Sequence, residues 1–183
     1  GSATITGSDI DGGSSDNCAV SSLTASTTSF TCADIGANSV TLTVTDASAN
    51  TASCLSTVTV VDTTSPTAVC QNITVYLDAT GNASITAGDV DGGSTDNCGV
   101  AGLSVSPAIF TCADVGANNV TLTVTDASAN SSTCTAIVTV VDTNSPTAVC
   151  QNITVFLDGT GNATITGSDI DGGSSDNCAV SSL

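Results

Sequence analysis

The sequence predicts a tandem array of all-β sandwich domains that are stabilised by disulfides and follow a fixed sequence period. The stretch from Ser8 to Leu23 returns unchanged from Ser168 to Leu183, and a close variant runs from Gly88 to Leu103; the starts at 8, 88 and 168 set the period of 80. Short runs of alternating apolar and polar residues, typical of half-buried strands, are separated by turns rich in Gly, Asn and Asp. A β-helix would repeat over far fewer residues, so the sandwich is the better prediction.

The strands are expected where this alternation is clearest. VTLTVT places three apolar side chains on one face and three threonines on the other. No segment shows the period of an amphipathic helix, and Phe30 and Phe110, each just before Thr-Cys-Ala-Asp, are expected to fill the cores. The predicted strands cover residues 40–45, 57–61, 73–77, 120–125, 137–141 and 153–157, with shorter ones at 3–6, 83–86 and 103–106.

Two proline-containing segments mark the predicted domain boundaries. VVDTTSPTAVC and VVDTNSPTAVC read as a last strand, a short linker and the next first strand, because proline suits the start of a strand. We therefore expect the rear part of one domain over residues 1–62, a complete domain over 63–142 and the front part of a third over 143–183, within a longer array. The linker is short and lacks glycine, so consecutive domains should be closely coupled.

The charge of the chain excludes several classes of partner. It has no Lys, Arg or His, and its 17 acidic residues, all Asp, give a formal net charge of −17. Nothing in the chain can neutralise a phosphate, so neither nucleic acid nor an anionic membrane surface is an expected partner. No apolar run approaches the roughly 20 residues needed to insert across a bilayer. The absence of His, Lys and a paired catalytic base also predicts that the protein is not an enzyme.

The cysteines predict an extracellular or cell-surface location. Nine cysteines follow the repeat period, which is typical of a disulfide framework formed in an oxidising compartment. A thiolate zinc site is the alternative, but the chain has no C-x-x-C pair and no His.

The DGGSxDN loops are candidate Ca²⁺ sites. Carboxylates this close in sequence repel one another unless a cation neutralises them, and a hard cation with oxygen ligands is the available solution. The alternative is that these residues only form solvated Asx-turns. The Asp126–Asn130 turn and Asp142 are weaker candidates: a metal at the domain junction would stiffen the array, whereas Asp62 and Asp142 could instead accept backbone hydrogen bonds. The predicted ligands are Asp9, Asp11, Asp16, Asn17, Asp89, Asp91, Asp96, Asn97, Asp169, Asp171, Asp176 and Asn177.

Two segments resemble the hyalin repeat (HYR) family. VTDASANSSTCTAIVTVVDTNSP at 124–146 resembles the end of one HYR module and the start of the next, and AVCQN at 68–72 resembles the first strand. The DGGSxDNC, FTCADVGAN and TAVCQNITV versions are similar to tandem repeats of giant surface proteins, adhesins and filaments, of Bacteroidota-type bacteria. The resemblance implies an immunoglobulin-like fold and a structural or adhesive role. The chain departs from the family in Ala49 and Ala129, where glycine is common, and in Ser65-Pro66, where Pro-Pro is common.

The resemblance also implies a disulfide pattern. It pairs Cys70 with Cys134, which leaves Cys98 for Cys112, and in the preceding repeat the same pattern uses Cys18 and Cys32. Partners of Cys54, Cys150 and Cys178 would then lie outside this sequence. A competing pattern joins Cys54 to Cys70 across the linker, and sequence alone does not decide between them.

Two functions from different classes follow. The first is the stiff shaft of an extracellular filament or giant adhesin, stabilised by disulfides and Ca²⁺, whose partners are neighbouring repeats and other copies in a fibre. The second is a surface module that binds polysaccharide or ice through the Asp loops or the threonine faces. Sugar sites usually display aromatic platforms, and the scarcity of aromatic residues, one Tyr and three Phe, favours the shaft.

Overall fold

The computed structural model describes all 183 residues as two compact units. The first unit contains residues 1–66 together with 95–101 and 125–131, and the second contains 67–94, 102–124 and 132–183. The units therefore do not follow the sequence repeat residue by residue. The first unit also includes two short segments of the second repeat, and these segments carry the residues discussed below.

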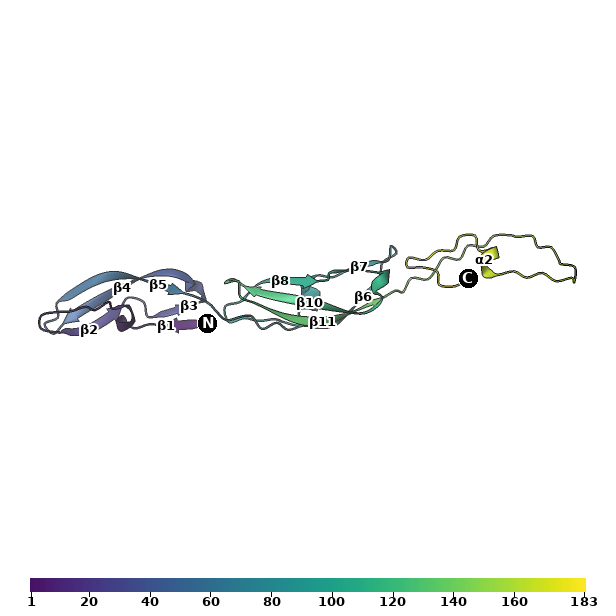
Figure 1. Cartoon of the computed structure of the whole chain (residues 1–183). Helices are drawn as coiled ribbons and strands as arrows, with labels where there is room; N and C mark the ends of the chain where they lie inside the picture. Colours follow the sequence, from purple (N-terminus) through teal and green to yellow (C-terminus); the bar gives the residue numbers. More distant parts are fainter. The chain divides into compact units, whose positions relative to one another are not determined.

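The first repeat forms a three-stranded sheet and a two-stranded sheet (Figure 1). The larger sheet has the order β2-β4-β5, and both of its pairings are antiparallel. The smaller sheet pairs β1 antiparallel with β3, which places Ala3 opposite Phe30. The strands are β1 (Ser2–Thr4), β2 (Val20–Ala25), β3 (Ser29–Thr31), β4 (Gly36–Asp46) and β5 (Thr51–Val60).

The second repeat has the same arrangement with one further strand. Its larger sheet has the order β6-β11-β10-β8, and β6 runs parallel to β11 with Ile73 opposite Val138. Its smaller sheet pairs β7 antiparallel with β9. The strands are β6 (Ile73–Tyr76), β7 (Asn82–Ser84), β8 (Val100–Ser106), β9 (Ile109–Thr111), β10 (Gly116–Asp126) and β11 (Ser131–Val141).

Helical segments are single turns that begin at a capping box. In α1, for example, the side chain of Asp89 accepts a hydrogen bond from the backbone of Thr86, which precedes the turn. None of these turns is long and apolar enough to be a membrane span. The segments are η1 (Gly7–Ile10), η2 (Cys32–Asp34), α1 (Ala87–Val90), η3 (Cys112–Asp114) and α2 (Gly167–Ile170).

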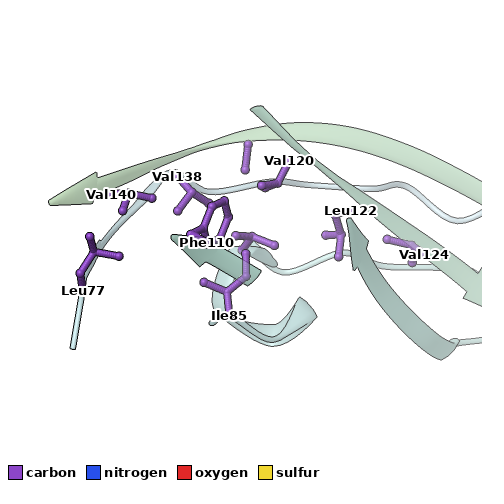
Figure 2. Close-up of a cluster of buried hydrophobic side chains, with 10 residues drawn as sticks. Leu77, Ile85, Phe110, Val120, Leu122, Val124, Val138 and Val140 are labelled. Carbon is purple, nitrogen blue, oxygen red and sulfur yellow. The ribbon is translucent and has the colours of Figure 1, made fainter. Parts of the chain in front are cut away.

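The core of the second unit lies between its larger and smaller sheets. Phe110 of β9, 1% exposed, lies beside Val138 of β11 in the middle of the cluster, with Leu122 toward one end and Leu77 toward the other (Figure 2). Phe30 is the equivalent residue of the first unit and is 2% exposed. Both phenylalanines therefore fill cores as predicted. The buried cluster contains Leu77, Ile85, Val90, Phe110, Val120, Leu122, Val124, Ala136, Val138 and Val140.

These observations confirm the predicted fold class: the chain is an all-β protein of tandem, disulfide-stapled, immunoglobulin-like β-sandwich repeats. The strands predicted in the first two repeats form close to the expected positions, and the structure adds three that the alternation did not predict: β2, β3 and β9. The strand expected over residues 153–157 does not form. Its equivalent β6 pairs with β11, whereas residues 153–157 pair with no strand of this chain. A lone strand without a partner leaves its backbone groups to water.

Candidate functional site

Two of the three disulfides join successive repeats. Cys32 is bonded to Cys98 and Cys112 to Cys178, with Cα–Cα distances of 5.3 and 5.2 Å. Cys70 is bonded to Cys134, the pair that the HYR resemblance implied. The other implied pairing is wrong, because Cys98 does not bond Cys112, and neither does Cys32 bond Cys18. Free and exposed thiols remain at Cys18, Cys54 and Cys150, and no Cys54–Cys70 bond is present.

The loop that precedes Cys98 explains the correction. We call the contact of this loop with residues 1–66 the first junction; it lies wholly within the first unit. There the backbone carbonyl of Asn97 lies 3.5 Å from Cys32 Sγ and accepts a hydrogen bond from the Gly1 amino group at 3.0 Å. Cys98 is thereby placed on the preceding repeat, 66 residues from Cys32, and not beside the cysteine nearest in sequence.

The second junction, within the second unit, has the same construction one period further along the chain. The Asn177 carbonyl lies 3.4 Å from Cys112 Sγ, and Asn177 Nδ2 donates to the backbone carbonyl of Asp78 at 3.1 Å. Gly81 permits this approach: its φ is +76°, and a Cβ added there would lie 2.6 Å from Cys112 Sγ and 2.8 Å from the Asn177 carbonyl oxygen. A glycine is therefore required at the junction both for its backbone conformation and for space.

Three carboxylates meet at the first junction. Single ligand oxygens of Asp62, Asp96 and Asp126 all lie within 4.8 Å of one another. Asp62 ends the first repeat, whereas Asp96 and Asp126 belong to the second. Asp62 is 8% exposed and Asp126 is 4% exposed, so two of the three charges are largely removed from water. We call this group the junction cluster.

Each member of the junction cluster is held by hydrogen bonds. Asp126 Oδ1 accepts from the amides of Ser128 and Asn130, at 2.9 and 2.8 Å, and its Oδ2 accepts from Asn130 Nδ2 at 2.8 Å. Asn130 Nδ2 also donates to the backbone carbonyl of Asp62 at 3.1 Å, which links the two repeats. Asp96 Oδ2 accepts from the Cys98 amide at 2.7 Å.

Two oxygens of the first junction lack a suitable partner. Asp62 Oδ1 accepts from the Thr64 amide, but Asp62 Oδ2 is buried with no hydrogen-bond donor. The side-chain oxygen of Asn97 lies 3.2 Å from both carboxylate oxygens of Asp96, a contact between acceptors. Rotating this amide would give Asp96 two donors but would remove the bond from Asn97 Nδ2 to Asp62 Oδ1 at 3.3 Å. A cation bound by the three carboxylates would neutralise the group.

The electrostatic cost of the junction cluster is substantial without a cation. At 4.8 Å, and with an effective dielectric constant of about 20, two like charges repel by about 3 kcal/mol. The chain has no Lys, Arg or His to offset this repulsion. All-oxygen donor sets of carboxylates, amide oxygens and backbone carbonyls are those preferred by Ca²⁺, so the residues present fit that ion.

Other predicted ligands accept hydrogen bonds within turns. Asp89 Oδ2 accepts from the Thr86 amide and hydroxyl, and these bonds, the backbone one foremost, lower the pKa of its carboxyl below the ordinary value. Asp91 accepts from the hydroxyl and amide of Ser94, which lower its pKa in the same way. The same roles fall to Asp9 and Asp169, which cap helical turns, and to Asp11 and Asp171, which hold the following serine.

The structure does not gather the predicted ligands of the first copy, Asp9, Asp11 and Asp16, or those of the third, Asp169, Asp171 and Asp176, into comparable groups. Asp16 does line a shallow groove with Asp46, the equivalent of Asp126. At the second junction, Asn177 Nδ2 donates to Asp142 Oδ1 at 3.2 Å, as Asn97 does to Asp62. Asn17, Asn97 and Asn177 thus occupy equivalent positions, two of them in contact with the end of the preceding repeat.

The sequence did not indicate that the three carboxylates of the junction cluster form one group. Asp126 was a weaker candidate than the DGGSxDN loop, and for Asp62 a metal at the junction was weighed against a backbone hydrogen bond. Asp62 and Asp126 lie far apart in sequence, and local spacing does not reveal that they meet. The available signal was the recurrence of each carboxylate once per period on either side of the linker.

Comparisons with known proteins give little further guidance. No family model matches the chain, and no curated protein matches it. Among solved structures, it is similar to the extracellular cadherin domains 1–4 of protocadherin gamma B7, with a TM-score of 0.37 and 13% sequence identity. The match covers 74% of this chain and 46% of the protocadherin chain, so the chain spans less than half of that structure's length.

Proposed function

We propose that this chain is part of the load-bearing shaft of an extracellular filament or giant cell-surface adhesin, and that it carries out no catalysis. The observation that carries the proposal is the order of the disulfides along the chain: 32–98, 70–134 and 112–178. The first cysteine of each later bond lies within the loop that the preceding bond closes. Successive repeats are therefore joined by disulfides as well as by the main chain. Disulfides of this kind are typical of oxidising, extracellular surroundings.

The interleaved disulfides limit how far the chain can be stretched. From Cys32 the shortest covalent path crosses to Cys98, follows the main chain to Cys112 and crosses to Cys178. Fully extended, the segment between positions 98 and 112 spans about 50 Å, whereas the whole main chain between positions 32 and 178 would span about 500 Å. An array built in this way resists elongation even when its sandwiches unfold, which suits a shaft under tension.

Further features support an exposed, durable fibre. The chain lacks Lys and Arg and so has no site for trypsin-like proteases. The resemblance of residues 124–146 to HYR modules supports a place in a tandem surface array of the Bacteroidota type. We also assign Ca²⁺ as a stabilising ion, because a strongly acidic extracellular chain without cationic side chains depends on external cations. The partners are neighbouring repeats and other copies within a fibre.

Force spectroscopy on the whole chain, held at its two ends, tests this proposal. Reduction should lengthen the fully extended chain by about 450 Å, the length of the residues that the disulfides exclude from the covalent path. A Cys54→Ser variant should behave as the unmodified protein does, because Cys54 is free and exposed. Equal extended lengths before and after reduction would refute the load-bearing role of the disulfides.

A further inference from the structure

We propose that Asp62, Asp96 and Asp126 bind one Ca²⁺ at the first junction, and that the Cys32–Cys98 disulfide positions this site. The inference rests on the proposed function, since it assigns to the shaft a specific ion site that exists only where two repeats meet. The ligands are not the loop carboxylates that lie closest in sequence. They come from the end of one repeat and from two separate segments of the next.

Burial and an unpartnered oxygen point to a ligand. Asp62 is more than nine-tenths buried and its Oδ2 has no hydrogen-bond donor. One of its carboxylate oxygens lies within 4.8 Å of one oxygen each of Asp96 and Asp126. Buried carboxylate oxygens are almost always paired or bound to metal. The equivalent loop of the second junction shows the same deficiency, because Asp176 Oδ1 and Asn177 Oδ1 are buried without partners. Unpaired oxygens thus recur at both junctions.

Ligand chemistry favours Ca²⁺ among the divalent ions. The available donors are the carboxylate oxygens of the three aspartates, and the chain contains no His. Ca²⁺ binds oxygens at roughly 2.3–2.6 Å, so oxygens on opposite sides of the ion are about 5 Å apart, which matches a group contained within 4.8 Å. Mg²⁺ needs shorter, strictly octahedral bonds and retains several waters, so it should bind more weakly.

The disulfide and one amide position the ligands. Asp96 lies just before Cys98 and accepts from the Cys98 amide, so the Cys32–Cys98 bond holds its carboxylate at the first repeat. Asn130 Nδ2 contacts both Asp126 Oδ2 and the Asp62 carbonyl. Since preorganised ligands bind without an ordering cost, loss of the disulfide should weaken Ca²⁺ binding.

Calorimetric titration of the chelator-treated, full-length chain with CaCl₂ tests the assignment. The unmodified chain should show one high-affinity site, and MgCl₂ should bind at least tenfold more weakly. Asp62→Asn and Asp126→Asn should each lower the Ca²⁺ affinity at least tenfold. The matched controls Asp142→Asn and Asp46→Asn change the equivalent residues, which belong to no three-carboxylate group, and should leave that affinity unchanged.

Asp62→Asn also separates a ligand from a structural carboxylate. Asparagine keeps an Oδ1 that can accept from the Thr64 amide and replaces only the unpartnered oxygen. In EDTA the variant should unfold at the same temperature as the unmodified chain or a higher one, and added Ca²⁺ should raise it less. A lower unfolding temperature in EDTA, or Ca²⁺ affinity within threefold of the unmodified chain, would overturn the proposal.

Cys32→Ser tests whether the disulfide positions the site, and it should weaken Ca²⁺ binding about tenfold without abolishing it. Unchanged affinity would overturn that part of the inference.

Peptide mapping of the oxidised, unmodified chain with an Asp-specific protease distinguishes the two proposals. A mapped Cys32–Cys98 bond without Ca²⁺ binding would leave the shaft standing and remove the ion site. Absence of that bond would remove the covalent basis of the shaft, whatever the calorimetry shows.

Discussion

The two turns of sequence TDASAN have the same local structure and different surroundings. In each, the aspartate accepts hydrogen bonds from the amides two and four residues later, at 2.8 to 2.9 Å, and from the asparagine side chain at 2.8 Å. Asp126 is nevertheless 4% exposed, whereas Asp46 is only half-buried. Asn130 Nδ2 donates to the Asp62 carbonyl as well as to its own turn, whereas Asn50 Nδ2 donates to Asp46 of its own turn.

This difference shows that each repeat supplies only some of the residues that form a junction. The turn forms from its own residues, because Asp and Asn satisfy the backbone locally. Burial of the carboxylate requires the end of the preceding repeat, which brings a third charge to Asp96 and Asp126.

Loss of the first junction's disulfide should have the largest effect. Cys32→Ser removes a bond between residues 66 apart, and loop-closure entropy predicts that the first unit loses about 4 kcal/mol of unfolding free energy. Urea unfolding followed by hydrogen exchange would measure this unit separately. Cys18→Ser changes a free, exposed thiol and is the matched control. Equal losses in both variants would show that the disulfide does not stabilise the junction.

Gly81→Ala should destabilise the second junction by about 2 kcal/mol, because it forces a positive φ on alanine and crowds the Cys112 sulfur. Gly102 is a suitable control, since a Cβ there meets nothing within 4 Å and its φ is not in the left-handed region. The readout is the urea midpoint of the second unit. If Gly81→Ala and Gly102→Ala shift that midpoint equally, the close approach of the loop does not constrain position 81.

Asn130→Ala should lower the free energy of unfolding by about 1 kcal/mol more than Asn50→Ala does. Both variants lose the bond to the aspartate of their own turn, but only Asn130 also donates to the Asp62 carbonyl. Urea unfolding of the two variants, measured in EDTA to exclude any bound ion, gives the difference directly. Identical losses would mean that the contact between repeats contributes nothing beyond the turn.

Acid should lower the stability of both units, and by less than the substitutions above. Hydrogen bonds, from Thr86 to Asp89 or from Asn50 to Asp46, lower the pKa of these carboxyls below 3.8. A folded-state pKa that is depressed contributes stability above the unfolded value, and that stability is lost as the pH falls below about 4. Hydrogen exchange in EDTA at pH 6 and pH 3 should show reduced protection in both units. Unchanged protection in both units would contradict the stabilising role of these hydrogen bonds.

The sequence alone predicted the fold and the repeat because both depend on local patterns. Alternation in VTLTVT located β4 and β10, and Phe30 and Phe110 were correctly assigned to cores. The edge strand at 153–157 was predicted from the same alternation, but a strand also needs a neighbour, and periodicity does not report one. Asp89 and Asp91 accept hydrogen bonds within their own turns, and a carboxylate that caps a turn has the same sequence signature as one that binds an ion.

The partners of Cys98, and the contact of Asp62 with Asp126, were decided by tertiary structure alone. Both depend on how the end of one repeat packs on the loops of the next, through contacts between residues far apart in the sequence. Residue spacing determines turns and strands, whose hydrogen bonds are local or between adjacent segments. It does not determine which of several identical repeats supplies the other half of a disulfide or an acidic cluster, because every repeat carries the same residues.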